Sequence, residues 1–451
     1  MTAKPDVAFI GLGAMGFGMA THLVKQGYAV TGFDVWQPTL DKFAAAGGQT
    51  ATTPAAAVAG KSVCVCMVAT AQQAQQVLVE GEAAAAAALP QNAVILLCST
   101  VPCGYVQSLA AALADPQGPV RRPDLLLVDC PVSGGAARAA DGTLSIMAGA
   151  SPDALANAAG RTVLADLADP ARLYYLVGGG IGAGSNTKMV HQVLAANQIL
   201  SGPEAMGLAV RLGLPANTAT LEALLQSPGR SWMFGHRGPR MVDGSQPLAS
   251  AVNIIVKDTA IITSEARRAA FPALMTSVVE NVLYTAVNRG FGGKDDSQLL
   301  QLYTEGVPPP TANAASPDAS LRLVTHLLKG IHLVSAAESL AFAHHVGLDL
   351  DLVLDLCINA AGGSAMLETH GPGIVAVLRN ESAPPPKGDA SAATESLGEI
   401  YNNLAQVVDA AQAIKAPIHL GTQALNLLRL ALRKSGSESV PAAAAVNVWI
   451  G

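Results

Sequence analysis

The sequence has no uninterrupted apolar stretch long enough to span a bilayer, although half of its 451 residues are hydrophobic. Only 13% of the residues are charged, the formal net charge is −6, and no basic cluster is present, so the composition gives no support to nucleic-acid binding. The six cysteines show neither metal-ligand spacing nor a disulfide framework. The N-terminal segment lacks the small-residue cleavage site of a secretory signal. We therefore expect a reduced, cytoplasmic protein without a metal site and without membrane contacts.

Residues 1 to about 176 alternate short apolar runs with helical patterns, which is the rhythm of βαβ units in a doubly wound parallel sheet. The pattern changes after the glycine-rich segment 178–182, and from Ser185 onward it is helical nearly to the end. The expected fold class is therefore α/β, with a Rossmann-type doubly wound sheet followed by helical domains. Strands are expected at 7–10, 28–33, 63–68, 94–98, 125–129 and 145–148.

A glycine-rich turn follows the first expected strand, with the pattern G-x-G-x-x-G at 11–16. Its first glycine allows a tight bend, the second lets the backbone approach a pyrophosphate, and the third lets the next helix pack on the strand. Asp34 ends the second strand, where its carboxylate could accept a hydrogen bond from a ribose 2′-hydroxyl and would repel the 2′-phosphate of NADP. The alternative is a tight turn without a ligand. We predict that NAD binds to Gly11, Gly13, Ala14, Met15, Gly16 and Asp34.

Three more cofactor contacts are expected where strands end, because ligands of doubly wound sheets bind at the carboxyl edge. Met67 and Val68 close the run 63–68, and Thr100 follows the run 94–98. Lys257 stands beside Asp258 inside an apolar run and is a further candidate for contact with the cofactor. A surface ion pair of little energetic weight is the alternative explanation for this pair.

Residues 129–135 read Asp-Cys-Pro-Val-Ser-Gly-Gly and follow an expected strand. The hydroxyl of Ser133 and the backbone amides of Gly134 and Gly135 would suit a substrate carboxylate. An ordinary proline- and glycine-containing loop would show the same residues.

Lys188, His191 and Gln192 have the spacing i, i+3 and i+4, which places them on one face of an expected helix. A lysine on such a face can donate a proton to, or accept one from, a reacting oxygen. A surface lysine and a hydrogen-bonded core histidine are the alternatives.

The helical part contains an internal repeat. Residues 188–215 match residues 322–349 in register at a constant offset of 134, which indicates duplication rather than chance similarity of alanine-rich helices. The second copy is degenerate, since it has Arg322 in place of the lysine, and arginine is a poor proton acceptor. We expect domains at 1–176, 177–306 and 319–451, with a proline-rich linker at 307–318.

Taken in order, the glycine turn, the loop at 129–135, the segment 182–192 and the pair at 257–258 resemble the β-hydroxyacid dehydrogenase family. The resemblance covers residues 5–305. It implies a Rossmann domain followed by tandem helical domains like those of 6-phosphogluconate dehydrogenase, NAD as cofactor, a small hydroxy-acid substrate and hydride transfer. It makes Lys188 the catalytic residue, and the substrate-binding residues would be Ser133, Gly134, Gly135, His191 and Gln192.

Within the family, the residues at 188–192, 231–234, 257–258 and 293–297 look most like the L-threonate dehydrogenase branch, whose substrates are four-carbon sugar acids. Most of the family has asparagine where this chain has His191 or Gln192, so which of the two contacts the substrate stays open. The alternatives are a 3-hydroxyisobutyrate dehydrogenase or a tartronate semialdehyde reductase. Two minor alternatives are a 6-phosphogluconate dehydrogenase-like enzyme and a non-enzymatic NAD-binding scaffold. Single-repeat relatives pair through this helical domain, so the second repeat would act as an internal partner in a possible homo-oligomer.

Overall fold

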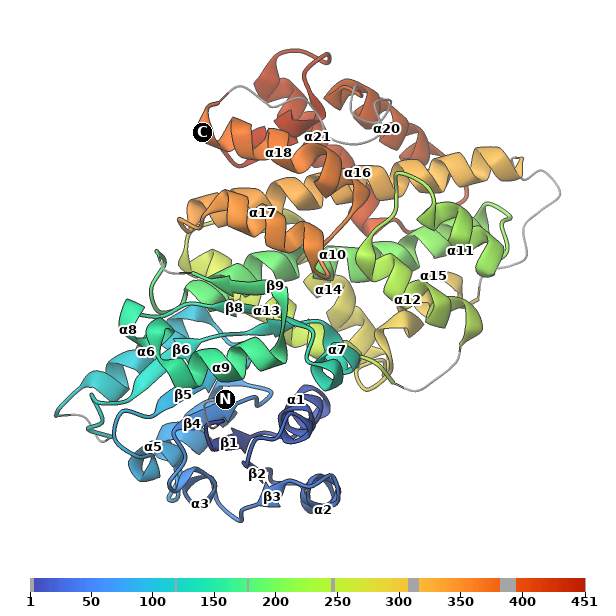
Figure 1. Cartoon of the computed structure of the whole chain (residues 1–451). Helices are drawn as coiled ribbons and strands as arrows, with labels where there is room; N and C mark the ends of the chain where they lie inside the picture. Colours follow the sequence, from blue (N-terminus) through green and yellow to red (C-terminus); the bar gives the residue numbers. More distant parts are fainter. Residues whose placement is uncertain are drawn as a thin grey trace. The chain divides into compact units, whose positions relative to one another are not determined.

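The computed structural model describes residues 4–117, 120–176, 178–244, 248–306, 316–381 and 395–450. The expected linker at 307–318 lies largely outside these residues. The chain divides into two compact units, Met1–Lys188 and Met189–Gly451 (Figure 1). In the described parts of the chain, no helix combines the length and apolar character that a membrane crossing requires.

The first unit is built on a six-stranded sheet with the order β3-β2-β1-β4-β5-β6, in which every neighbouring pair is parallel (Figure 1). A second, three-stranded sheet has the order β7-β8-β9. The expected strands are all present, and most are shorter by one or two residues than the apolar runs that predicted them. The strands are β1 Val7–Ile10, β2 Val30–Phe33, β3 Gln49–Thr50, β4 Val63–Cys66, β5 Val94–Leu97, β6 Leu126–Asp129, β7 Val132–Ser133, β8 Leu144–Ala148 and β9 Ala168–Tyr175.

Helices cover both faces of the large sheet, because alternate strand residues are buried on opposite sides. One face packs Phe9 and Val65 against α1 and α9, and the other packs Ile10 and Cys66 against α3, α5 and α6. All six cysteines are buried. The helices of this unit are α1 Ala14–Lys25, α2 Gln37–Ala45, α3 Pro54–Val58, α4 Ala71–Gln75, the π-helix Gln76–Glu80, α5 Ala85–Ala88, α6 Cys103–Ala114, α7 Gly135–Asp141, α8 Pro152–Ala156 and α9 Ala158–Leu167.

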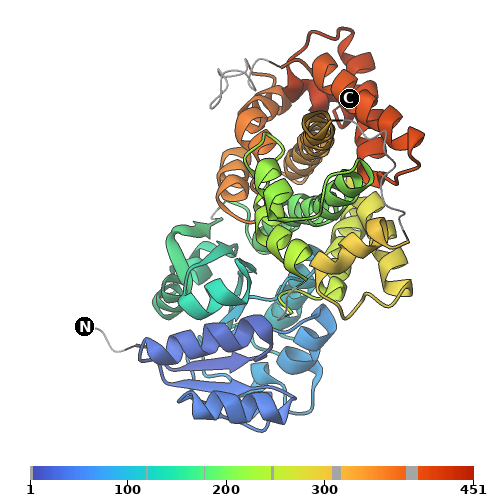
Figure 2. The ribbon, with the colours of Figure 1, turned by 90° about the vertical axis from the view of Figure 1, so that its right-hand side faces the viewer.

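The second unit contains two series of helices that correspond in order. Each series begins with a 29-residue helix, α10 Ala183–Arg211 and α16 Pro317–His345, and α10 starts within the last residues of the first unit. The first series continues with α11 Thr218–Leu225, α12 Trp232–Asp243, α13 Val252–Arg268, α14 Leu274–Asn288, the 3-10 helix η2 Asp296–Leu300 and α15 Gln301–Thr304. The second continues with α17 Leu350–Asn359, α18 Ala365–Arg379, α20 Leu397–Ala413, α21 His419–Ser435 and the 3-10 helix η3 Ala442–Val448. In Figure 2, α16 is seen nearly end-on among the helices of its own series, which pack against it.

The two series hold each other through a reciprocal pair of buried glutamates. Glu204 of α10 accepts hydrogen bonds from the backbone N–H groups of Leu420 and Gly421, at 3.1 and 2.9 Å, in the first turn of α21. Glu338 of α16 accepts from the backbone N–H groups of Met275 and Thr276, at 2.6 and 3.0 Å, in the first turn of α14. Each side chain therefore accepts from buried amides at a helix N-terminus of the other repeat, which have no partner within their own helix.

This arrangement predicts a pH-dependent stability. Burial raises the pKa of Glu204 to about 7, above its usual 4.5. Because the pKa of Glu204 is higher in the folded than in the unfolded protein, protonation of this side chain stabilises the folded state. This stabilisation is fully present below pH 4.5 and is lost as the pH rises through 7. The loss is on the order of 3 kcal/mol for a shift of this size. We expect Glu204→Gln to flatten the dependence of Tm on pH in this window, measured by thermal unfolding. If Tm depended on pH as steeply in the variant as in the unchanged protein, the assignment of this pH dependence to Glu204 would be contradicted.

Candidate functional site

The glycine turn lies between β1 and α1 and is packed too closely for side chains at two of its three glycines. Gly11 has φ +93°, and a side chain there would collide with the backbone of Met67. A side chain at Gly16 would collide with the carbonyl of Gly11. At Gly13, in contrast, an added Cβ would meet no atom within 4 Å. The turn therefore has open space beside its middle glycine, where a pyrophosphate would approach the backbone.

Asp34 lies at the end of β2 and ties that strand to the turn. Its Oδ2 accepts from the backbone N–H of Leu12 at 2.7 Å, and its Oδ1 accepts from the backbone N–H of Trp36 at 2.9 Å. Each carboxylate oxygen can accept a second hydrogen bond, so ribose hydroxyls could still be bound. The next residue, Val35, is 89% exposed and provides no positive charge for a phosphate.

The structure brings Met67 and Val68, the first two residues after β4, to the glycine turn. The backbone N–H of Met67 donates to the carbonyl of Ile10 at 2.8 Å, and that of Val68 donates to Ser99 Oγ at 2.9 Å. Thr100 follows this serine at the end of the neighbouring strand. The turn, Asp34 and these residues thus form one edge of the first unit, and their geometry fits a dinucleotide.

Lys257 belongs to the helical unit rather than to this edge. It lies on α13, and its Nζ is 3.1 Å from Asp258 Oδ1. The structure confirms an ion pair between these neighbours, and the expected cofactor contact of Lys257 stays a prediction.

The predicted carboxylate-binding loop, residues 129–135, runs from the end of β6 through β7 to the first residue of α7. Ser133 is 5% exposed, and Gly134 and Gly135 have φ of 143° and 74°, values that L side chains rarely adopt. An added Cβ at Gly135 would meet nothing within 4 Å. The glycines therefore permit a backbone path that leaves room beside the second of them.

Asp129, which the sequence did not single out as a functional residue, anchors the first turn of α10. It is fully buried at the end of β6, and its two oxygens accept from the backbone N–H and the Oγ of Ser185, at 2.6 and 2.8 Å. Burial raises the pKa of Asp129 to about 7. A side chain at Gly184 would collide with the Asp129 carbonyl, which explains the glycine in that turn. The helix that carries Lys188 is thus fixed to the strand that precedes the carboxylate-binding loop.

Lys188, His191 and Gln192 lie on α10 and are 6%, 0% and 8% exposed, so all three are buried. His191 Nδ1 is 3.1 Å from Gln192 Oε1, and Gln192 Nε2 donates to Asp258 Oδ2 at 2.5 Å. The interpretation of Lys188 as a surface lysine is therefore wrong. The contact with Gln192 adds Asp258 to this group of buried residues, whereas the sequence had indicated Asp258 only as the neighbour of Lys257.

The acidic residues of the motif at 293–297 belong to a buried ion-pair network. Arg237 of α12 donates to Asp296, with Nη2 to Oδ2 at 2.8 Å, and Arg240 Nε donates to Asp295 Oδ1 at 3.2 Å. Asp295 also accepts from the backbone N–H group of Ala249 and from the hydroxyl of Ser297, and such hydrogen bonds lower its pKa. These contacts give the motif a structural role between α12 and η2.

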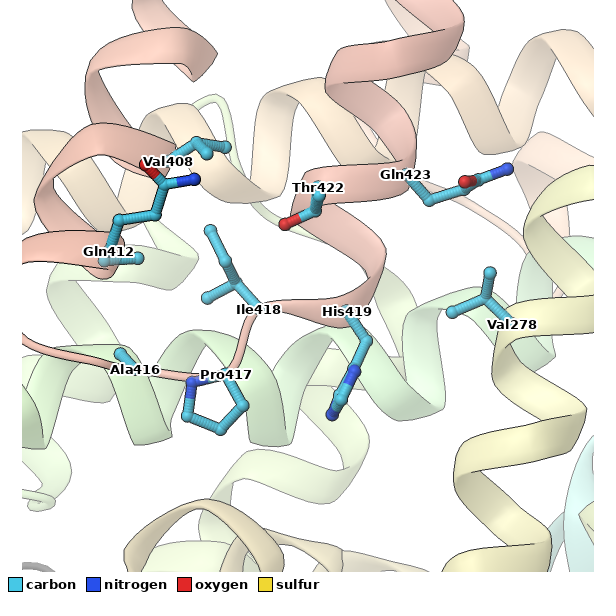
Figure 3. Close-up of a pocket in the computed structure, with 10 residues that line it drawn as sticks. Val278, Val408, Gln412, Ala416, Pro417, Ile418, His419, Thr422 and Gln423 are labelled. Atoms are coloured by element: carbon cyan, nitrogen blue, oxygen red, sulfur yellow. The ribbon is translucent and has the colours of Figure 1, made fainter.

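A surface pocket of about 370 Å³ lies among α14, α20 and α21, and no residue predicted for the site lines it (Figure 3). Ala416 is among its lining residues and corresponds to Phe271 of the first repeat, since α14 and α21 start at 274 and 419. Phe271 stacks on Phe342 with ring centroids 4.4 Å apart. The second repeat therefore has no aromatic ring at the place of Phe271.

Family models match both units of the chain. The "NAD binding domain of 6-phosphogluconate dehydrogenase" matches residues 6–178. The "NAD-binding of NADP-dependent 3-hydroxyisobutyrate dehydrogenase" matches twice, at 182–303 and 319–449. A dinucleotide-binding sheet followed by these helical domains defines an oxidoreductase that uses NAD. The chain belongs to the β-hydroxyacid dehydrogenase family, whose members include the 3-hydroxyisobutyrate dehydrogenases, and it carries the helical domain in two copies.

Individual relatives agree with this assignment. The L-threonate dehydrogenase of Cupriavidus necator is 37% identical over 298 residues, which are 66% of this chain and 96% of that protein. A crystal structure of 3-hydroxyisobutyrate dehydrogenase from Salmonella typhimurium is 31% identical, with a TM-score of 0.60 over 66% of this chain and 100% of that one. The 6-phosphogluconate dehydrogenase of Plasmodium falciparum is 13% identical and shows the shared fold, with a TM-score of 0.66 over 94% of this chain and 92% of its own.

Proposed function

We propose that the protein oxidises a four-carbon sugar acid such as L-threonate, with NAD as acceptor and Lys188 as the catalytic residue. The observation that carries the proposal is the buried polar face of α10, where a lysine, a histidine and a glutamine lie on a helix anchored by Asp129. Relatives named L-threonate dehydrogenase, at 33–37% identity, support the substrate class.

In this mechanism each group of residues has one task. Gly11, Gly13 and Gly16 would hold the pyrophosphate and Asp34 the adenine ribose, with Met67, Val68, Thr100 and Lys257 as further contacts. When bound, NAD supplies the acceptor for the hydride that leaves the substrate's hydroxyl-bearing carbon. Ser133, Gly134 and Gly135 would bind the substrate carboxylate. Lys188 would accept the proton of the reacting hydroxyl through its amine and stabilise negative charge on that oxygen as it develops.

A second candidate substrate is 3-hydroxyisobutyrate, because the similar protein of known structure from Salmonella typhimurium is named 3-hydroxyisobutyrate dehydrogenase. Both substrates are small hydroxy acids, and they differ in the number of hydroxyl groups. A panel that contains L-threonate, 3-hydroxyisobutyrate and the reduced form of tartronate semialdehyde, assayed for NADH formation, separates these activities.

We expect NAD to be preferred over NADP by at least about tenfold in kcat/KM, because the Asp34 carboxylate would lie close to the 2′-phosphate and like charges repel at a cost of several kcal/mol. Asp34→Asn keeps an oxygen for the Leu12 amide and removes the charge. This variant should therefore have a smaller ratio of kcat/KM with NAD to kcat/KM with NADP. Steady-state kinetics with both cofactors provide the measurement. Equal use of NADP by the unchanged protein would contradict the role of Asp34.

We also propose that the second repeat acts as an internal partner of the first, in place of a neighbouring subunit. The reciprocal contacts of Glu204 and Glu338 support this role. Deleting residues 312–451 should expose apolar surface of the first repeat and cause aggregation or new self-association, detectable by light scattering. A truncated protein that is monomeric and active would overturn the proposal.

A further inference from the structure

The strand β8 runs antiparallel to the predicted carboxylate-binding loop and pairs with it. Asp129 and Gly149 exchange backbone hydrogen bonds at 3.0 and 2.9 Å. Further along the same ladder, Ser133 of β7 lies directly opposite Ser145 of β8. Side chains that lie opposite each other in an antiparallel pair project from the same face, with Cβ atoms about 4.5–5.5 Å apart. The hydroxyl groups of the two serines are therefore neighbours.

The two serines project from the face of this small sheet to which α10 is attached. Their strand neighbours Val132 and Leu144 belong to the apolar core of the first unit, so the serines face the other way. Asp129, two positions out of step with Val132 and Leu144 in the same alternation, shares the face of the serines. Its carboxylate accepts hydrogen bonds from the first turn of α10. The serine pair thus lies on the side of the sheet that holds the helix with the predicted catalytic lysine.

The hydroxyl of Ser145 is enclosed and lacks a partner. The residue is 0% exposed, and its Oγ has no hydrogen-bond partner within the described parts of the chain. A buried hydroxyl in this state destabilises the fold, so the fold alone gives no reason for a serine rather than an alanine. Because Ser145 is enclosed, it cannot touch a substrate and can act only through a neighbour. The polar neighbour directly opposite is Ser133.

We propose that Ser145 is a positioning residue that orients the hydroxyl of Ser133 toward the substrate carboxylate. This inference deepens the proposed function and rests on it for the role of Ser133. A serine hydroxyl has one hydrogen to donate, and when Ser133 donates it to a carboxylate, its oxygen can still accept the hydrogen of Ser145. Rotation about one side-chain bond brings the two oxygens within reach. Successive hydrogen bonds of this kind strengthen each other, so Ser145 contributes to binding of the acid rather than to the chemical step.

The first test is calorimetric titration of L-threonate into the full-length protein saturated with NADH, a complex that has no hydride acceptor. We expect Ser145→Ala to raise the Kd about fivefold, the scale of one hydrogen bond, while kcat changes by less than about twofold. Its Tm should be unchanged or higher, because the variant removes a buried hydroxyl without a partner. An unchanged Kd, or a loss confined to kcat, would overturn the proposal.

A serine of the second repeat provides the matched control. Ser335 of α16 is 1% exposed, and its hydroxyl donates to the carbonyl of Ile331 at 2.7 Å. Ser335→Ala therefore removes an equally buried hydroxyl at a distance from the loop, and it should leave the Kd for L-threonate unchanged. A rise in Kd as large as that of Ser145→Ala would show that loss of any buried hydroxyl weakens binding, which would overturn the specific role of Ser145.

The second test repeats the titration with Ser133→Ala and with the double variant. Since Ser145 acts through Ser133, adding Ser145→Ala to Ser133→Ala should not raise the Kd further. A fivefold rise in both backgrounds would refute the positioning role. If another hydroxy acid of the panel is oxidised better than L-threonate, that acid is titrated instead. Absence of turnover and of binding with every acid would refute the proposed function and this inference with it, whereas turnover with a Kd that Ser145→Ala leaves unchanged would refute only the inference.

Discussion

Replacing Lys188 with methionine is expected to lower kcat by about 10³-fold, the scale of general acid–base catalysis, because methionine can neither accept the hydroxyl proton nor stabilise charge on the oxygen. The side chain is 6% exposed, so an apolar residue of similar length should be tolerated by the fold. NADH binding, followed by fluorescence titration, should stay close to that of the unchanged protein. Retention of more than a few per cent of activity with the best substrate would contradict the catalytic role of Lys188.

The duplicated helical domain supplies the control for this experiment. Arg322 corresponds to Lys188 at the offset of 134 residues and is exposed on α16. Arg322→Ala should leave kcat nearly unchanged, because the second repeat has no lysine at this place. A comparable loss of activity in both variants would indicate that the two repeats contribute to turnover in a way that the degenerate second sequence does not predict.

Replacing Asp296 with leucine is expected to destabilise the protein by about 3–5 kcal/mol, because it leaves the buried Arg237 guanidinium without its main counter-charge. Asp296 is 0% exposed and Arg237 is 8% exposed, so water cannot compensate for the missing carboxylate. Denaturant unfolding of the helical unit, followed by circular dichroism, measures the change. A loss below about 1 kcal/mol would contradict this interpretation, since that is the range of exposed ion pairs.

The double substitution of Arg237 with methionine and Asp296 with leucine removes both charges. It therefore separates the destabilisation caused by an unpaired buried charge from the contribution of the ion pair to the free energy of unfolding. Buried ion pairs replaced by apolar residues of similar volume are often neutral or stabilising. We therefore expect the double variant to recover most of the stability that the single variant loses. If the double variant were as unstable as the single variant, packing between α12 and η2, rather than charge, would determine the loss of stability.

Local patterns in the sequence were sufficient to predict the parallel sheet and its glycine turn. Apolar runs bounded by turn residues predicted six strands, and the strands β3, β7 and β9 were not predicted. Gly11 and Gly16 are required by the close packing that the structure shows. The duplication was likewise visible as a constant offset. Each of these features depends on residues within a few positions of one another or on a repeat of whole segments.

The contacts that hold the site together could not be predicted in the same way. Asp129 and Ser185 are 56 positions apart, Gln192 and Asp258 are 66 apart, and Glu204 and Gly421 are 217 apart. Aspartate, serine and glutamine are common in loops and on helix surfaces, so nothing in their local sequence marks them as buried partners. Only the fold brings each pair together.

The measurement that tests the central claim most directly is NADH formation by the purified full-length protein with NAD and L-threonate, assayed beside Lys188→Met. We predict turnover by the unchanged protein, with L-threonate used better than 3-hydroxyisobutyrate, and a nearly complete loss in the variant. No NADH formation with any hydroxy acid of the panel, or equal activity in the two proteins, would contradict the assignment of an NAD-dependent hydroxyacid dehydrogenase that works through Lys188.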